Sequence, residues 1–182
     1  GLGACGDGGM VVTNNQKICE RIQMLRDYGR IGRYEHVLKG YNSRLDTLQA
    51  AVLRVKLAYI DQWNKKRQEN AAYYNINFAG LPLKIPHVAP YSTHTYHQYV
   101  VRVKGSSAKL MEHLKNKGVE ARVYYPVPQH LQDCFKYLGY KKGDFPVSEK
   151  ASKETLALPV FPELTEGELA RVAAAVKEFF TC

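Results

Sequence analysis

The sequence predicts a mixed α/β chain, arranged as an α+β lobe in its C-terminal part. Residues 97–103 alternate polar and apolar side chains and stop at Gly105, as a strand with one wet face does. From Asp46 onward, apolar residues instead recur at helical spacing over several turns. Because a strand, a helix and a second strand follow one another after Pro90, we expect a small α+β sandwich preceded by a long helix.

Length and composition indicate an ordinary globular protein of one domain or slightly more. The chain has 182 residues, of which 45% are hydrophobic and 24% charged, and this excludes disordered and fibrous classes. It contains no run of 18 apolar residues and no leader pattern, so we expect a cytoplasmic protein that does not enter a membrane. The four cysteines are far apart, without a CxxC pair, and are expected to be free thiols rather than metal ligands.

The formal net charge is +9, from 26 basic and 17 acidic residues. The basic residues are scattered along the whole chain, and no nucleic-acid recognition motif accompanies them. Nucleic acid is therefore not an expected partner. A phosphorylated small ligand and plain solvated faces both remain compatible with this charge.

The first residues contain a glycine pattern that does not mark a dinucleotide site. Gly1, Gly3 and Gly6 fit GxGxxG, but no strand precedes them and no helix follows. Gly8 and Gly9 are better interpreted as a turn that enters a strand at residues 10–13. One such strand cannot close a sheet, so its pairing partners are expected outside the sequence given.

Two helices are predicted on either side of a polar loop. The first starts at Asn14 or Asn15 as N-cap and ends at Gly29. The second has Asp46 as its cap and Gln49 three residues later, a variant of the capping box. It is expected to run as one helix to about Tyr74 or Phe78, before glycine and proline stop it.

The loop between these helices carries hydrogen-bonding groups with little apolar mass. Its candidate binding residues are Tyr34, His36, Tyr41, Asn42 and Arg44. Polar loops that are held against a long helix often contribute binding groups. A well-hydrated surface loop without a site is the alternative.

The C-terminal part is predicted to continue with short elements. Ser106 would cap a helix, Val119–Tyr124 would form a second strand, and residues 83–85 a possible third. Residues 131–138 would form a short helix, and a further helix from Phe145 would stop before Pro159. The inward residues of the helix after Ser106 would be Leu110, Met111 and Leu114.

The last helix is marked by a capping box, Thr165 with Glu168. Its predicted core face consists of Leu169, Val172, Ala173, Val176, Phe179 and Phe180. Between the sheet and these helices, two alternating prolines stiffen residues 124–130 and could hold Tyr125 and His130 in place. A rigid connector without a site is the alternative there.

These residues by themselves do not name a reaction, but eight segments in order closely resemble a known family. They are residues 3–9 (GACGDGG), 26–29 (RDYG), 40–46 with 49–51 (GYNSRLD, QAA), 96–99 with 101–102 (YHQY, VR), 125–130 (YP through His130), 138–140 (LGY), 143–146 (GDFP) and 158–165 (LPVFPELT). The chain resembles the C-terminal half of the sugar aminotransferases of the DegT/DnrJ/EryC1/StrS family. These are pyridoxal-phosphate enzymes of fold type I.

The resemblance implies the C-terminal part of a fold type I PLP-dependent transferase. Residues 1–46 would be an edge piece of the large domain with a cofactor-contacting loop. Residues 47–80 would be a long linking helix, and residues 81–182 a small antiparallel-sheet domain. The family's catalytic lysine is expected immediately before Gly1, so no catalytic residue is assigned within the chain, and residues 1–182 would be the part downstream of that lysine.

The resemblance also implies an activity. The enzymes it resembles use pyridoxal 5'-phosphate to move an amino group from an amino acid, usually glutamate, to a keto group of a nucleotide-linked sugar. They act as homodimers with sites shared between subunits.

In this chain, Asn42 matches the asparagine that reaches the cofactor phosphate of the neighbouring subunit. Arg44 matches a position suited to a substrate carboxylate or phosphate, although an ion pair with Asp46 or another acid is equally compatible. Tyr125 and His130 match positions on the sugar-nucleotide side.

Two other functions are compatible with the resemblance. Some members carry a histidine in place of the lysine and dehydrate the sugar, and the residue before Gly1 would distinguish them. The chain could also belong to a non-catalytic dimerisation or regulatory module. The sugar, the carbon and the nucleotide stay open, because many of their contacts are expected from the missing half.

Overall fold

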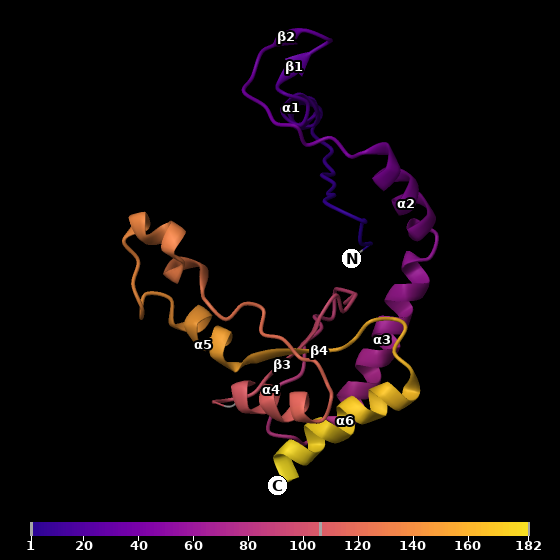
Figure 1. The fold of residues 1–182 in the computed structure, drawn as a ribbon, viewed down its shortest axis with the longest axis vertical. Helices are drawn as coiled ribbons and strands as arrows, with labels where there is room; N and C mark the ends of the chain where they lie inside the picture. Colours follow the sequence, from indigo (N-terminus) through magenta and orange to yellow (C-terminus); the bar gives the residue numbers. More distant parts are fainter. Residues whose placement is uncertain (1, 106, 182) are drawn as a thin grey trace. The chain divides into compact units, whose positions relative to one another are not determined.

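The computed structural model describes residues 2–105 and 107–181 (Figure 1). The chain divides into two compact units, Gly1–Ile60 and Asp61–Cys182, called unit 1 and unit 2 below. This division is a property of the described structure. The domain limits expected at residues 46 and 80 stay predictions.

Unit 1 contains two helices and a small hairpin. They are α1 (Gln16–Leu25), β1 (Arg30–Ile31), β2 (Glu35–His36) and α2 (Thr47–Leu57). The hairpin is antiparallel, with Arg30 opposite His36. The start of α1 is as predicted, because the Asn15 side chain accepts a hydrogen bond from the Ile18 N–H at 3.3 Å.

The strand predicted at residues 10–13 is absent from the described chain, so that prediction is wrong for the chain by itself. Met10 and Val12 are 88% and 83% exposed. A strand needs a neighbouring strand to satisfy its backbone N–H and C=O groups, and the described residues supply none here. Partners outside the sequence given stay a prediction.

The single long helix expected after Asp46 is two helices, α2 and α3 (Ile60–Asn77). Between the two helices the backbone makes a tighter turn of the 3-10 type. There the N–H groups of Ala58 and Tyr59 donate to the carbonyls three residues earlier instead of four. The prediction of a capping box at Asp46 is also wrong. Asp46 caps without a side-chain hydrogen bond, and the Gln49 side chain binds elsewhere.

Unit 2 is built on an antiparallel pair of strands, β3 (Tyr99–Arg102) and β4 (Thr155–Leu158), in which Tyr99 lies opposite Leu158. Its other elements are α3, α4 (Ser107–Asn116), the 3-10 helices η1 (Gln129–Leu131) and η2 (Asp133–Leu138), α5 (Pro146–Glu154) and α6 (Glu166–Thr181). Helices α4 and α6 lie against each other (Figure 1).

Several predicted limits in unit 2 differ from the structure. Residues 155–158 were expected to be helical, but they form β4, because the sheet gives them backbone partners on β3. The strands expected at residues 119–124 and 83–85 are each reduced to one bridge, Arg122 with Ala157 and Lys84 with Arg102. Met111 is 36% exposed and does not point inward, and the cap expected at Ser106 lies outside the described residues.

The hydrophobic core belongs to unit 2, since the buried hydrophobic side chains of the described residues begin at Ala71. The Tyr74 ring stacks on Phe78 with centroids 5.4 Å apart, and its hydroxyl donates to the Pro159 carbonyl at 2.9 Å. The predicted capping box of α6 is confirmed, with the Thr165 N–H 2.8 Å from a Glu168 carboxylate oxygen. The predicted core face of α6 is buried over Leu169, Val172, Ala173 and Val176, and packed at its edge by Phe179 and Phe180.

Over the residues that the structure describes, no helix combines the length and apolar character that crossing a membrane requires. Cys5, Cys19 and Cys134 carry free thiols, as expected.

Candidate functional site

The candidate site in unit 1 is the loop that returns from β2 to the C-terminal end of α1. Three backbone hydrogen bonds fasten it there. The Tyr41 N–H donates to the Leu25 carbonyl at 2.7 Å, and the Tyr28 N–H donates to the Tyr41 carbonyl at 2.9 Å. The Ser43 N–H donates to the Arg26 carbonyl at 2.8 Å. The loop therefore has a defined backbone on both sides of Asn42.

Two glycines allow the loop and the end of α1 to come this close. A Cβ on Gly40 would lie 2.0 Å from the backbone nitrogen of Gly29. Gly29 itself has a φ of +71°, and a Cβ there would lie 1.9 Å from the Leu38 carbonyl oxygen. A residue with a side chain fits neither position without moving backbone.

Asn42 forms a bridge with Asp27 through the backbone, while its side chain is exposed. Among the residues described, the Asn42 amide has no hydrogen-bond partner. A carboxamide offers two N–H donors and one acceptor oxygen. The side chain expected to contact a phosphate is therefore held by its backbone and available to a ligand.

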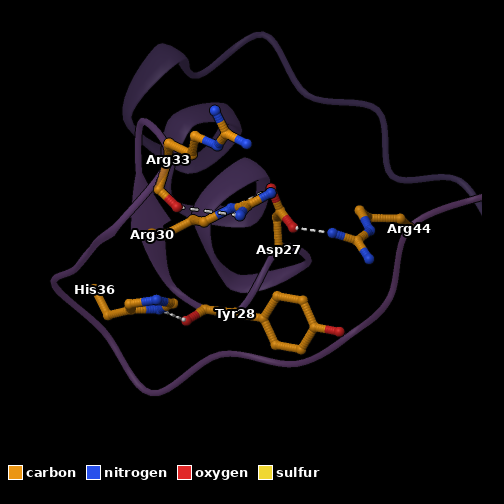
Figure 2. A network of polar contacts seen from close by, with 6 residues as sticks. All are labelled: Asp27, Tyr28, Arg30, Arg33, His36 and Arg44. Carbon is orange, nitrogen blue, oxygen red and sulfur yellow. Dashed lines mark hydrogen bonds and ion pairs between the residues drawn. The ribbon is translucent and has the colours of Figure 1, made fainter.

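Asp27, the backbone bridge partner of Asn42, is the centre of a polar network (Figure 2). One carboxylate oxygen is 2.6 Å from Arg44 Nη1, and the other is 2.8 Å from both Nε and Nη2 of Arg30. The Arg30 hydrogen bond is the largest cause of a lowered pKa at Asp27, and Arg44 adds to it. The Asp27 carboxylate is therefore ionised at neutral pH.

Arg44 forms the ion pair that was expected as one alternative, but with Asp27 rather than Asp46. Its guanidinium also lies over the Tyr28 ring, 5.2 Å from the centroid. The Arg44 side chain is 45% exposed, so part of it faces solvent. Contact with a substrate stays a prediction for this residue.

Two further contacts connect the hairpin with the residues around Asp27 (Figure 2). His36 Nδ1 lies 3.0 Å from the Tyr28 carbonyl oxygen, which requires a proton on Nδ1 because a carbonyl only accepts. Arg30 Nη1 donates to the Arg33 carbonyl at 3.3 Å. The first contact holds β2 to the backbone of Tyr28, and the second joins the hairpin turn to Arg30, which also binds Asp27.

The sequence pattern by itself assigns no site role to Asp27 or Arg30. A signal for them exists, because residues 21–34 hold four arginines and a single acidic residue, Asp27. One carboxylate among several guanidinium groups is expected to pair with those that the fold brings near. Spacing alone does not say which arginines these are.

The N-terminal segment of unit 1 is held against α2. Gln49 Oε1 accepts a hydrogen bond from the Cys5 N–H at 2.9 Å, and Lys56 Nζ donates to the Gly3 carbonyl. A Cβ on Gly6 would lie 3.0 Å from Gln49 Nε2. Gln49 thus positions the segment that was expected to follow the catalytic lysine.

In unit 2, His130 lies in a buried cluster. His130 Nε2 is 3.1 Å from Glu149 Oε1, and the two side chains are 8% and 11% exposed. The same carboxylate oxygen accepts a hydrogen bond from the Gly143 N–H at 2.7 Å. This hydrogen bond is the largest cause of the lowered pKa of Glu149. The Phe145 ring covers His130 with centroids 4.8 Å apart.

Tyr125, in contrast, is 69% exposed. It packs edge-on against Tyr124 and lines a shallow pocket with Pro128 and Thr155. The structure thus brings Asn42 together with Arg44 in unit 1, and places Tyr125 and His130 in unit 2. Of these four side chains, His130 is the one that is buried.

Comparison with known proteins assigns the chain to a family. The family model of the DegT/DnrJ/EryC1/StrS aminotransferase family matches residues 2–177, and the chain belongs to this family. Over 179 residues it is 41% identical to dTDP-3-amino-3,4,6-trideoxy-alpha-D-glucose transaminase of Streptomyces venezuelae, covering 98% of this chain and 47% of the relative. It is 42% identical to a pleiotropic regulatory protein of Geobacillus stearothermophilus over 182 residues, covering 98% and 49%.

Solved structures agree. The structure of S. venezuelae DesV in complex with a ketimine intermediate has a TM-score of 0.94 and 40% identity, covering 99% of this chain and 48% of that one. A DegT DnrJ EryC1 StrS aminotransferase from Brucella abortus has a TM-score of 0.91 and 31% identity, covering 100% and 48%. The predicted family and fold class are thus confirmed, and the chain spans about half the length of these relatives.

Proposed function

We propose that the complete polypeptide carrying this chain is a PLP-dependent aminotransferase of amino-sugar biosynthesis. It moves an amino group from an amino acid, glutamate, to a keto group of a nucleotide-linked sugar. The observation that carries this proposal is the 41% identity, over 98% of the chain, to a dTDP-amino-sugar transaminase. A relative from Acidithiobacillus ferrooxidans named for a UDP-linked substrate, 35% identical over 176 residues, supports the same substrate class.

The residues present fit a cofactor phosphate at Asn42. Its amide is exposed and has no partner among the residues described, and the backbone on both sides is fastened to α1. An amide N–H is a suitable donor to a phosphate oxygen. When bound, pyridoxal phosphate supplies the electron sink for the chemistry at the amino-acid carbon.

Arg44 would bind the anionic group of a substrate. Asp27 holds one end of its guanidinium at 2.6 Å, and the five N–H donors of an arginine exceed what this contact uses. A guanidinium that is already oriented loses less freedom when it binds a carboxylate or phosphate. In this proposal Asp27 is a positioning residue for Arg44.

Gln49 would help to position the lysine that is expected just before Gly1. Its hydrogen bond to the Cys5 N–H fastens the segment that follows the lysine to α2. A proton-transferring group must stay within hydrogen-bond reach of the atom it serves. Restricting the chain a few residues away contributes to that placement.

Tyr125 and His130 would line the sugar-nucleotide side. Tyr125 offers an exposed hydroxyl and ring for such a contact. His130 Nε2 is occupied by Glu149, so a direct contact of His130 with substrate would fall to Nδ1. The assignment of His130 therefore requires that Nδ1 reach the ligand.

We further propose that the enzyme is a cytoplasmic homodimer in which Asn42 reaches the cofactor of the neighbouring subunit. Tyr34 in the hairpin turn and Tyr41 in the candidate loop are 78% and 70% exposed, which suits a surface that is covered in an assembly. Neither nucleic acid nor membrane is part of this proposal.

An absorbance spectrum of the complete polypeptide tests the function. With pyridoxal phosphate added, we expect a visible band from lysine-bound cofactor, and glutamate should convert it to the amino form that absorbs in the near ultraviolet. Binding without the lysine-dependent band would favour the nucleotide-sugar dehydratase instead. No binding would contradict both activities.

A regulatory role is the second candidate, and it is favoured by the G. stearothermophilus relative, which is named a pleiotropic regulatory protein. In that case the polypeptide would bind neither pyridoxal phosphate nor a keto sugar productively. The same spectrum distinguishes the two, because glutamate would leave it unchanged.

A further inference from the structure

A basic pocket of about 440 Å³ lies in unit 2, where residues 81–84 meet the end of β3 and the C-terminal end of α5. Its cationic side chains are Lys84, Arg102, Lys104 and Lys150. Leu81, Pro82 and Leu83 are also among its lining residues. None of these residues belongs to the candidate sites described above.

The backbone around the pocket is well fastened. Lys84 and Arg102 exchange both of their backbone hydrogen bonds, each 2.9 Å long. The Val103 N–H donates to the Glu154 carbonyl at 2.8 Å, which joins the end of β3 to the end of α5. The backbone that carries Lys84 and Arg102 is therefore fixed, and this favours a binding site over a mobile surface.

The charges in the pocket are not balanced. Glu154 is the single carboxylate among the described lining residues, and it is buried, with 8% of its surface exposed. Its Oε2 accepts a hydrogen bond from Arg102 Nε at 2.7 Å, and its Oε1 lies 4.0 Å from Lys150 Nζ. One negative charge against four positive charges leaves three in excess.

Lys84 and Lys104 carry two of these three excess charges. In the part of the chain that the structure describes, neither has an ion-pair or hydrogen-bond partner for its ammonium group. Lys109 and Lys115 in unit 2 also have ammonium groups without a described partner, but these two lysines lie on the exposed surface of helix α4. The difference is that Lys84 and Lys104 line one concave pocket, where repulsion between like charges is relieved by an anion.

We propose that this pocket binds a small anion that carries several negative charges, of the pyrophosphate type. Lys84, Lys104 and Lys150 would contact its oxygens, and Glu154 would keep Arg102 oriented toward it. A volume of about 440 Å³ lies in the range typical of small-molecule sites, so an ester with an apolar group against Leu81 and Leu83 also fits. The proposal does not depend on the proposed function.

Inorganic pyrophosphate is the probe, and amine acetylation with residue-by-residue mass spectrometry is the readout. The complete polypeptide is acetylated at low ionic strength, without divalent cations, with and without pyrophosphate. We expect acetylation of Lys84, Lys104 and Lys150 to slow at least three-fold, while Lys109 and Lys115 in the same sample keep their rates. Equal rates at Lys84 and Lys104 with and without pyrophosphate would overturn the proposal.

A pair of double variants separates a site from general attraction of anions. In Lys84→Ala/Lys104→Ala, pyrophosphate should no longer protect Lys150, and the affinity derived from its protection should fall at least ten-fold. Lys109→Ala/Lys115→Ala removes the same charge from exposed positions and should preserve the protection of Lys150. Loss of protection in both double variants would contradict a defined pocket. Circular dichroism of both variants checks that the fold is kept.

Discussion

Gly29 and Gly40 cross so closely that a Cβ on Gly40 would lie 2.0 Å from the backbone nitrogen of Gly29. The crossing fastens the loop that carries Asn42 to the end of α1. It explains why this loop keeps a defined backbone although it contains few apolar side chains.

Gly40→Ala should therefore displace the loop. We expect a loss of at least about 2 kcal/mol of stability, because backbone must move to admit the methyl group. Faster proteolysis between residues 30 and 44 of the complete polypeptide measures the displacement. Gly167→Ala in α6 is the matched control, since no described atom apart from its chain neighbours and its own helix backbone lies within 4 Å of the added Cβ. It should be stabilising by about 0.5–1 kcal/mol. Equal behaviour of both variants would contradict the close crossing.

Asn42→Ala should weaken cofactor binding without affecting the fold. The Asn42 side chain makes no hydrogen bond to another described residue, so its removal leaves no described protein group unsatisfied. A lost hydrogen bond to a charged phosphate is worth about 1.5–3 kcal/mol, hence a Kd for pyridoxal phosphate raised about ten-fold or more. Absorbance titration measures the Kd, and Asn116→Ala on the surface of α4 is the control. An unchanged Kd would remove Asn42 from the proposed site.

Glu149→Gln should lower Tm at neutral pH. The Gly143 N–H and, to a smaller degree, His130 lower the pKa of Glu149 below its ordinary 4.5. Because the folded-state pKa is lowered, the stabilisation is present above pH 4.5 and is lost as the pH falls through the folded-state pKa. Thermal melts of wild type and variant should thus differ by a few degrees at pH 7 and converge as the pH falls through the folded-state pKa of Glu149.

The control for Glu149 is Glu112→Gln on the exposed surface of α4, where no contact of the carboxylate is lost. Its melting curve should follow wild type at every pH. A difference between wild type and Glu149→Gln that stays constant from pH 7 to pH 3 would mean that the carboxylate charge is not responsible.

The chain of residues 1–182 expressed by itself should have one stable unit and one unstable unit. Buried hydrophobic side chains of the described residues begin at Ala71, so unit 1 has no core to offset the entropy of ordering it. Limited proteolysis should destroy unit 1 and leave a fragment that starts near Asp61. Equal resistance of the two units would show that unit 1 is stable without further chain.

Local chemistry made part of the fold predictable. The caps at Asn15 and Thr165 depend on residues three positions apart, and both form as expected. Gly139 ends η2 with a φ of +76°, a conformation that glycine adopts at little cost. The core face of α6 follows from helical spacing. These features need only neighbours within one or two turns, and the sequence contains those neighbours.

Longer-range contacts decided the rest. Gln49 bonds to Cys5, 44 residues away, instead of closing a capping box, and residues 155–158 leave a helical pattern because β3 offers backbone partners. The sequence by itself determined the family, the helix limits set by caps, and Asn42 as a candidate. Only the tertiary structure decided that Asp27 pairs with both Arg30 and Arg44, and that His130 is buried against Glu149. The physical reason is that an ion pair depends on distance in space, which residue spacing does not specify.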